Sequence, residues 1–197
     1  GESGRAPLSQ GMISTAEQKA TSVATALGDH LDAGRDVVVI EPSDYAMFQR
    51  EYEKFLPGQT YERLAENSYE VMAYVYGLLE NGGDPAALAS TPQSIAYHAH
   101  CQQRTLGLEA HTVAVLESLG HDVVTSDVEC CGMAGSFGYK QEYYDLAMDV
   151  GDELAGQFTG ADTRDRTVVA SGTSCLEQLD SLLTRSATHP VELIAPT

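Results

Sequence analysis

Three short apolar runs in the second half of the chain each lead into a cysteine, and this arrangement constrains the fold more than any other feature. The runs and their cysteines are 95–98 with Cys101, 122–125 with Cys130 and Cys131, and 167–170 with Cys175. Short apolar runs of this kind are typical of strands in a parallel sheet that is covered on both faces. Because the carboxyl ends of parallel strands lie at one edge of the sheet, we expect the four thiols to meet there.

The rest of the chain alternates helical periodicity with short apolar runs. We expect a further strand at 37–40, an extended piece at 190–194, and helices at 14–33, 45–56, 61–80, 101–119, 142–158 and 175–183. This alternation predicts an α/β fold built from two similar small parallel-sheet units with flanking helices, the cysteines lying at the C-terminal ends of strands. The glycine- and proline-rich turn at 81–85 places a boundary between units 1–84 and 85–197, with 85–92 as the connecting loop.

The pattern also makes local predictions about capping and burial. Ser14 and Glu17 have the spacing of a capping box at the start of the first helix. The strand at 37–40 is a continuous apolar run, which indicates burial on both faces. Residues at helical spacing predict two buried helix faces, formed by Val23, Ala26, Leu27 and Leu31 in the first helix and by Leu146, Val150 and Leu154 in the helix at 142–158.

The two units share a faint repeat. Residues 2–4 (E-S-G) align with residues 130–132 (C-C-G), and residues 37–44 (V-V-V-I-E-P-S-D) align with residues 168–175 (V-V-A-S-G-T-S-C). We therefore expect the first unit to be a duplicated copy that has lost its thiols. Glu2, Ser3 and Asp44 stand where cysteines would be.

The charge of the chain excludes some partners. There are 29 acidic and 11 basic residues, and the formal net charge is −18. A surface of this kind repels nucleic acid and anionic lipid. The acidic residues are spread over the whole chain, which fits a protein from a high-salt organism; an acidic docking face for a basic partner is the alternative.

No apolar run has the roughly 18 residues that a membrane span needs, and no basic-then-apolar leader opens the chain. We therefore expect a soluble cytoplasmic protein with no transmembrane segment. The polar residues 1–11 lack an initiator methionine and indicate a cut into a longer protein.

The cysteine count limits the chemistry. Four cysteines are too few for a disulfide scaffold in a chain of 197 residues. Four thiolates suit an iron–sulfur cluster or Zn²⁺, whereas a lone cysteine is usually a small buried apolar residue. The long separations between the cysteines exclude the tight C-x₂-C loops of zinc fingers and bacterial ferredoxins, so the thiols can converge only through the fold. An iron–sulfur cluster is our preferred interpretation.

The residues around the cysteines add detail. Gly132, Gly135 and Gly138 let the backbone approach a cofactor closely, although their G-x-x-G-x-x-G spacing is not that of a dinucleotide site. A helix start beside Cys131 would lower the pKa of that thiol. His98 and His100 flank Cys101 on alternating sides of an extended segment, so at most one faces the site, and we favour His100.

At these residues the sequence resembles the cysteine-rich (CCG) domain of the Fe–S oxidoreductases, which occurs in heterodisulfide reductase, the glycolate oxidase iron–sulfur subunit and anaerobic glycerol-3-phosphate dehydrogenase. It most resembles the C-terminal region of fused FAD/4Fe-4S dehydrogenases of the D-lactate or 2-hydroxyacid type, from a haloarchaeon. The matching segments are 41–43, 98–103, 130–139, 171–175 and 189–193. The run C-C-G-M-A-G-S-F-G-Y at 130–139 is the specific one.

The resemblance implies that a 4Fe-4S cluster is held by Cys101, Cys130, Cys131 and Cys175. The chain departs from the family pattern at Gly172, which replaces the first cysteine of a C-x-x-C, and at Glu2, Ser3 and Asp44, so we expect one cluster at most. FAD and the ferredoxin-type clusters would lie on an upstream domain or a partner subunit. Such partners would hold the protein at the inner face of the membrane, and a quinone is a possible electron acceptor.

The function implied is electron transfer from a flavin that oxidises a 2-hydroxyacid such as D-lactate or glycolate, or glycerol 3-phosphate. No residue pair resembles a catalytic acid and base, so we assign no catalytic residue. The alternative is a structural or assembly domain, either with Zn²⁺ or metal-free. A third option is thiol–disulfide chemistry on a bound cluster.

Overall fold

The computed structural model describes residues 2–88 and 90–195. Gly1 of the polar opening and Ala89 of the expected connecting loop lie outside these ranges. The chain divides into two compact units, Gly1–Val71 and Met72–Thr197. Each unit has a parallel sheet with flanking helices, which confirms the predicted α/β class.

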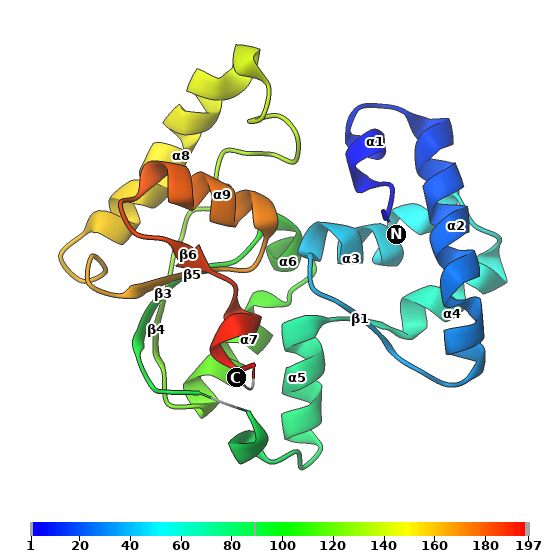
Figure 1. Cartoon of the computed structure of the whole chain (residues 1–197), viewed down its shortest axis with the longest axis horizontal. Helices are drawn as coiled ribbons and strands as arrows, with labels where there is room; N and C mark the ends of the chain where they lie inside the picture. The colour runs from blue at the N-terminus through cyan, green and yellow to red at the C-terminus, as the bar shows by residue number, and fades with distance from the viewer. Residues whose placement is uncertain (1, 89, 196–197) are drawn as a thin grey trace. The chain divides into compact units, whose positions relative to one another are not determined.

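The first unit alternates helices with two strands (Figure 1). Its elements are α1 (Arg5–Ser9), α2 (Ile13–Asp32), β1 (Val37–Val39), α3 (Pro42–Gln49), the 3₁₀ helix η1 (Glu51–Lys54), α4 (Gly58–Glu66) and β2 (Ser68–Glu70). Strand β1 pairs with β2 in parallel, and Val37 lies opposite Ser68. Helix α3 begins at Pro42, with the Glu41 side chain accepting a hydrogen bond from the Ser43 N–H.

The core of the first unit is built around a narrow alanine stripe on α2. The fully buried residues of this helix are Ala16, Ala20 and Ala24, whereas Val23 is half-buried and Ala26 is exposed. The buried face of α2 therefore lies to one side of the predicted face. Ala20 and Ala24 pack in a cluster with larger residues of α3, η1, α4 and the turn before α4, namely Met47, Phe48, Tyr52, Leu56 and Leu64. Small side chains let the helix backbone approach these larger residues closely.

Three local predictions for this unit were wrong. Helix α2 begins at Ile13 without a side-chain cap, so Ser14 lies inside it and forms no capping box. Strand β1 is not buried on both faces, because Val38 is 41% exposed and Ile40, just after it, is 57% exposed. The expected long helix at 61–80 is broken by β2. Side chains end α4 there, since Asn67 and Ser68 bond back to the carbonyls one turn earlier.

The second unit contains the longer sheet. Its elements are α5 (Val71–Glu80), η2 (Pro85–Ala87), β3 (Ser94–His98), α6 (Cys101–Thr105), α7 (Glu109–Ser118), β4 (Asp122–Thr125), η3 (Gln141–Tyr143), α8 (Tyr144–Thr159), β5 (Thr167–Ala170), α9 (Thr173–Leu182), β6 (Ala187–Thr188) and η4 (Pro190–Leu193). The three cysteine-linked strands were predicted within one residue. Strand β6 was not predicted, and 190–194 is largely a 3₁₀ helix instead of an extended piece.

All four strands of this sheet are parallel, in the order β4-β3-β5-β6. From β3 the chain moves outward to β4, then crosses back over β3 to β5 and continues to β6. Right-handed connections of opposite direction place their helices on opposite faces of a sheet. Accordingly, α8 and α9 lie together on one side, with α9 beside β5 and β6, while α7 lies beside β4 (Figure 1).

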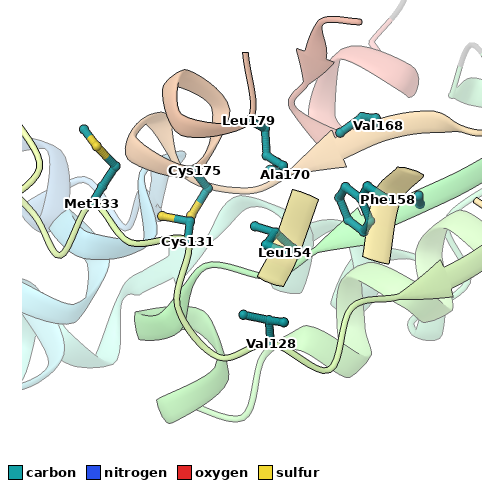
Figure 2. Close-up of a cluster of buried hydrophobic side chains, with 10 residues drawn as sticks. Val128, Cys131, Met133, Leu154, Phe158, Val168, Ala170, Cys175 and Leu179 are labelled. Carbon is teal, nitrogen blue, oxygen red and sulfur yellow. The ribbon is translucent and has the colours of Figure 1, made fainter. Parts of the chain in front are cut away.

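The core of the second unit lies between β5 and the helices α8 and α9 (Figure 2). Its members include Val168 and Ala170 from β5, Leu154 and Phe158 from α8, and Leu179 from α9. Two cysteines, Cys131 and Cys175, belong to the same cluster.

The buried face of α8 differs from the prediction. Leu154 is buried, but Leu146 is 53% exposed and Val150 is 42% exposed. Residues Ala147 and Gly151 face the core in their place. A Cβ at position 151 would come within 2.7 Å of Leu182 on α9, so the close approach of the two helices requires glycine there. A prediction based on the spacing of large apolar residues does not detect the small residues that permit this approach.

The expected helix at 101–119 is two helices, separated at Gly107, which has a left-handed φ of +73°. Within the described residues, no helix is both long and apolar enough to cross a membrane.

Candidate metal centre

The cysteines lie at the point where the strand order of the second sheet reverses. Strands β3 and β5 are neighbours, and the connections that leave them run to opposite sides. In open parallel sheets, ligands bind in the crevice outside the carboxyl ends of two such strands. Cys101 follows β3 and Cys175 follows β5, so two of the predicted site residues flank this crevice.

Both of these cysteines lie in the first turn of a helix. Cys101 is the first residue of α6, and Cys175 is the third residue of α9. The N–H groups and partial positive charge at a helix N-terminus favour a thiolate over a thiol.

Cys131 meets Cys175 in the core (Figure 2). Neither cysteine is in a disulfide, and both are buried, with exposed fractions of 4% for Cys131 and 2% for Cys175. The Cys175 thiol hydrogen-bonds to the Cys131 sulfur and holds the pKa of Cys131 below its usual range, with backbone N–H groups adding to the effect against the opposing influence of burial.

The loop that carries the cysteine pair makes a tight left-handed turn. Gly132 has a φ of +99°, and a Cβ there would come within 2.1 Å of the Ala147 carbonyl oxygen. Its N–H donates to the Cys130 sulfur at 3.4 Å. Gly135 also has a left-handed φ, while Gly138 packs against Met133. No helix begins beside Cys131 in the described loop, since the next α-helix starts at Tyr144, so the predicted helix-dipole effect on this thiol is wrong.

The donor set matches a soft metal centre in chemistry. None of the four cysteines is in a disulfide. Cys101 and Cys130 are half-buried; Cys101 begins α6 after β3, and Cys130 lies on the loop after β4. Thiolates prefer iron–sulfur clusters, Zn²⁺ or Cu(I). In geometry the structure brings Cys131 and Cys175 together, but it does not gather a full ligand set. No group of three or more His, Cys, Asp or Glu side chains within residues 2–88 and 90–195 is arranged to hold a metal ion.

The two histidines before Cys101 have different surroundings. His98 is fully buried, its Nδ1 lies 2.8 Å from the Ser126 hydroxyl, and burial lowers its pKa to about 3. His100 caps α6 by accepting the Gln102 N–H, and its Nδ1 lies 3.9 Å from the Cys101 sulfur. His100 is therefore the histidine beside a predicted site thiol.

A buried hydrogen-bond network ties the two cysteine turns together. The Ser171 hydroxyl accepts the His100 N–H at 3.0 Å and donates to the Gln103 side-chain oxygen at 2.6 Å. Tyr97 donates to the same oxygen, and His189 Nε2 lies 3.1 Å from the Ser171 carbonyl oxygen. Because Ser171 follows β5 and Gln103 lies in α6, the network fixes the two turns relative to each other.

This network was not predicted from the sequence. The signals for it are weak: Ser171 directly follows an apolar run, and His189 precedes Pro190 and Glu192 with capping-box spacing. Nothing in the local sequence pattern indicates that these residues belong to one network, since Tyr97 and His189 are far apart in the sequence.

The fold and the site together define a class of protein: an α/β domain in which two cysteines flank the point where the strand order of a parallel sheet reverses, and one of them, Cys175, contacts Cys131. Comparison with protein families agrees with this class. Residues 95–180 match the family described as CCG, cysteine-rich domain.

Among the curated relatives are a dehydrogenase subunit and a dehydrogenase. The chain is 29% identical over 116 residues to one subunit of the anaerobic glycerol-3-phosphate dehydrogenase of Escherichia coli K12, covering 57% of the chain and 28% of that protein. It is 27% identical over 188 residues to D-2-hydroxyglutarate dehydrogenase of Pseudomonas putida, covering 94% of the chain and 17% of that protein. The chain thus spans less than a third of these relatives. No solved structure matches it.

Proposed function

We propose that the chain is the electron-transfer part of an FAD-linked dehydrogenase and that Cys101, Cys130, Cys131 and Cys175 hold a 4Fe-4S cluster. The observation that carries the proposal is the contact between the buried Cys131 and Cys175 beside the strand-order reversal. The other two thiols lie on loops that follow adjoining strands of the same sheet. A bound cluster would supply one-electron transfer, which no amino-acid side chain here provides.

The protein matrix supports such a centre in three ways. Helix N-termini at Cys101 and Cys175 favour thiolates, and the Gly132 N–H already donates to a cysteine sulfur. Gly135 and Gly138 shape the same loop. His100 lies beside Cys101 as a neighbour of the centre.

The relatives guide the choice of parent reaction. One is named for glycerol 3-phosphate and the other for D-2-hydroxyglutarate, which is a 2-hydroxyacid. We propose that electrons reach this chain from a flavin that oxidises a 2-hydroxyacid or glycerol 3-phosphate and leave it toward an acceptor such as a quinone. The FAD-binding domain and ferredoxin-type clusters would belong to other parts of the parent protein or to partner subunits.

We propose that the first unit is a thiol-free copy of the region that runs from the cysteine pair to β6. In both regions a loop and helices lead to a strand, and further helical segments lead to a second strand parallel to it; the first unit has α3, η1 and α4 between its strands, whereas the second has only α9. Gly4 has a φ of +93° and faces the Ala16 carbonyl, as Gly132 faces that of Ala147. The Ser3 hydroxyl donates to Asp44 at 2.5 Å, where the second unit has the Cys131–Cys175 contact. A hydroxyl and a carboxylate are hard ligands, so this copy would hold no soft centre.

The acidic surface belongs to the proposal as well. A net charge of −18 suits a cytoplasmic protein that works at high salt, as in a haloarchaeon, with partners holding it at the inner membrane face.

A second function is favoured by one observation. No three candidate ligands converge among the described residues, which favours a metal-free set of thiols that serves assembly of the parent complex; a Zn²⁺-bound set would need all four thiols to converge.

The deciding experiment compares anaerobically purified wild-type protein with a C130A/C131A variant. The proposal requires iron and acid-labile sulfide in the wild type and their loss in the variant. A matched control, S181A on the exposed side of α9, keeps full iron content. Full iron occupancy in the double variant would rule out these cysteines as ligands. Zinc in the wild type would support the structural function.

A further inference from the structure

The backbone conformation at position 172 does not require glycine. Its φ of −132° is ordinary extended backbone that any residue adopts. Space is what excludes a side chain. A Cβ at this position would lie 2.2 Å from the Cδ2 atom of His100 and 2.9 Å from its Cγ atom. The imidazole ring therefore occupies the place of the missing side chain.

The other contacts of His100 place its ring between the two cysteine turns. Its backbone N–H donates to the Ser171 hydroxyl at 3.0 Å, in the turn that leads to Cys175. Its Nδ1 accepts the Gln102 N–H at 3.1 Å, in the first turn of the helix that begins with Cys101. One edge of the ring thus contacts the Cys101 turn, and the other contacts Gly172.

We propose that His100 and Gly172 form a complementary pair that sets the position of Cys101 relative to the turn carrying Cys175. His100 is then a positioning residue for the thiol site. The packing itself is independent of any cofactor; its consequence for metal binding rests on the proposed function.

The hydrogen bonds also assign the tautomer of His100. A neutral imidazole has one nitrogen that accepts and one that donates. Because Nδ1 accepts the Gln102 N–H, the proton resides on Nε2. A metal ligand needs a free lone pair, so neither nitrogen of His100 is a ligand in this form.

A double-mutant cycle tests the packing on metal-free protein. G172A is expected to lower the thermal midpoint by about 4–10 °C, because overpacking beside a fixed ring is strongly destabilising. In a H100A background the same change is expected to cost less than half as much, since only the Cβ of residue 100 remains nearby, at 3.2 Å. The loss of the helix cap is common to H100A and H100A/G172A, so it cancels in the cycle.

Gly156 provides the matched control, because a Cβ there meets nothing within 4 Å. G156A is expected to leave the midpoint unchanged or raise it. If G172A lowers the thermal midpoint equally with and without His100, the proposed packing of His100 on Gly172 is wrong. If G172A does not fold at all, the proposed packing predicts that H100A/G172A folds.

Positioning is tested with Co²⁺ as a probe, followed by its thiolate charge-transfer absorbance. H100A/G172A is expected to bind Co²⁺ about ten-fold more weakly than wild type although its midpoint has recovered relative to G172A, because the ring that positions Cys101 is absent. Recovery of wild-type affinity in the double variant would overturn the positioning role. If wild-type protein binds no soft metal, the proposed function fails, and the thermal cycle still decides whether the pair exists.

Discussion

At the scale of single residues, the buried titratable groups carry the clearest consequences. Burial lowers the pKa of His98 in the second unit and raises the pKa of Asp44 in the first unit. Each therefore links the stability of its own unit to pH, in opposite directions.

His98 is expected to destabilise the protein as the pH falls. Its pKa is lowered to about 3 by burial and by Arg104, so between pH 6.5 and 3 the unfolded chain binds a proton that the folded chain does not. As the pH falls through this window, the free energy of unfolding should therefore decrease, by at most about 1.4 kcal/mol per pH unit. Urea unfolding at pH 7, 6 and 5 measures this slope, and H98N, which preserves a hydrogen-bonding group near Ser126, should flatten it. Equal slopes in both proteins would contradict the assignment.

Asp44 is expected to act in the opposite sense. Burial raises its pKa, against the opposing influence of the Ser3 hydrogen bond, so the folded chain retains a proton that the unfolded chain has released. Stability should fall as the pH rises from the unfolded pKa of 3.8 through the raised value. D44N should remove this dependence. The difference in unfolding free energy between wild type and D44N, followed from pH 3.5 upward, measures it; a difference that does not change with pH would refute the prediction.

At the scale of elements, the sequence predicted the parts of the fold that depend on local pattern. The strands at 95–98, 122–125 and 167–170 are short apolar runs between turn signals, and all three are present. The errors arose where tertiary contacts decide. Strand β2 breaks a stretch whose sequence has continuous helical periodicity, because Asn67 and Ser68 bond to backbone carbonyls. The buried face of α8 depends on a glycine, Gly151, that a pattern of large apolar residues does not reveal.

The same reasoning limits what could be predicted of the site. The cysteines and the adjacent His100 are visible as residue types that follow strands. Their pairing is not: the contact of Cys131 with Cys175, and the packing of His100 on Gly172, depend on how three loops fold over one sheet edge.

Two glycines on α8 provide a test at this scale. A Cβ at Gly151 would lie 2.6 Å from the Gln178 side chain and 2.7 Å from Leu182, whereas one at Gly156 meets nothing. G151A should therefore reduce the free energy of unfolding by about 1–3 kcal/mol. G156A should increase it by a few tenths to about 1 kcal/mol, because alanine favours the helix. Chemical denaturation of both variants measures the two effects, and a neutral G151A would contradict the packing of α8 on α9.

At the scale of the whole molecule, the dominant physical feature is the charge. With a net charge of −18, the folded chain repels itself more than an extended chain does, and dissolved salt screens that repulsion. The density of exposed acidic residues is high on α8, where Asp145, Asp149, Asp152 and Glu153 are all exposed.

The thermal midpoint is therefore expected to rise by roughly 5 °C or more between 0.1 and 2 M NaCl. Replacing the four acidic residues of α8 by their amides changes the net charge from −18 to −14, that is, −18 + 4, and should reduce the response to salt. Differential scanning calorimetry across a salt series measures both. A midpoint that falls with salt, or a variant with an undiminished response, would count against a high-salt adaptation.

The central claim is that the four thiols of the second unit hold an iron–sulfur cluster. The most direct measurement is the iron, zinc and acid-labile sulfide content of protein purified without oxygen in high salt, together with its visible absorption spectrum. The account predicts about four iron and four sulfide per chain and a brown protein. Zinc without sulfide, or no metal in protein that is folded and fully reduced, would contradict it.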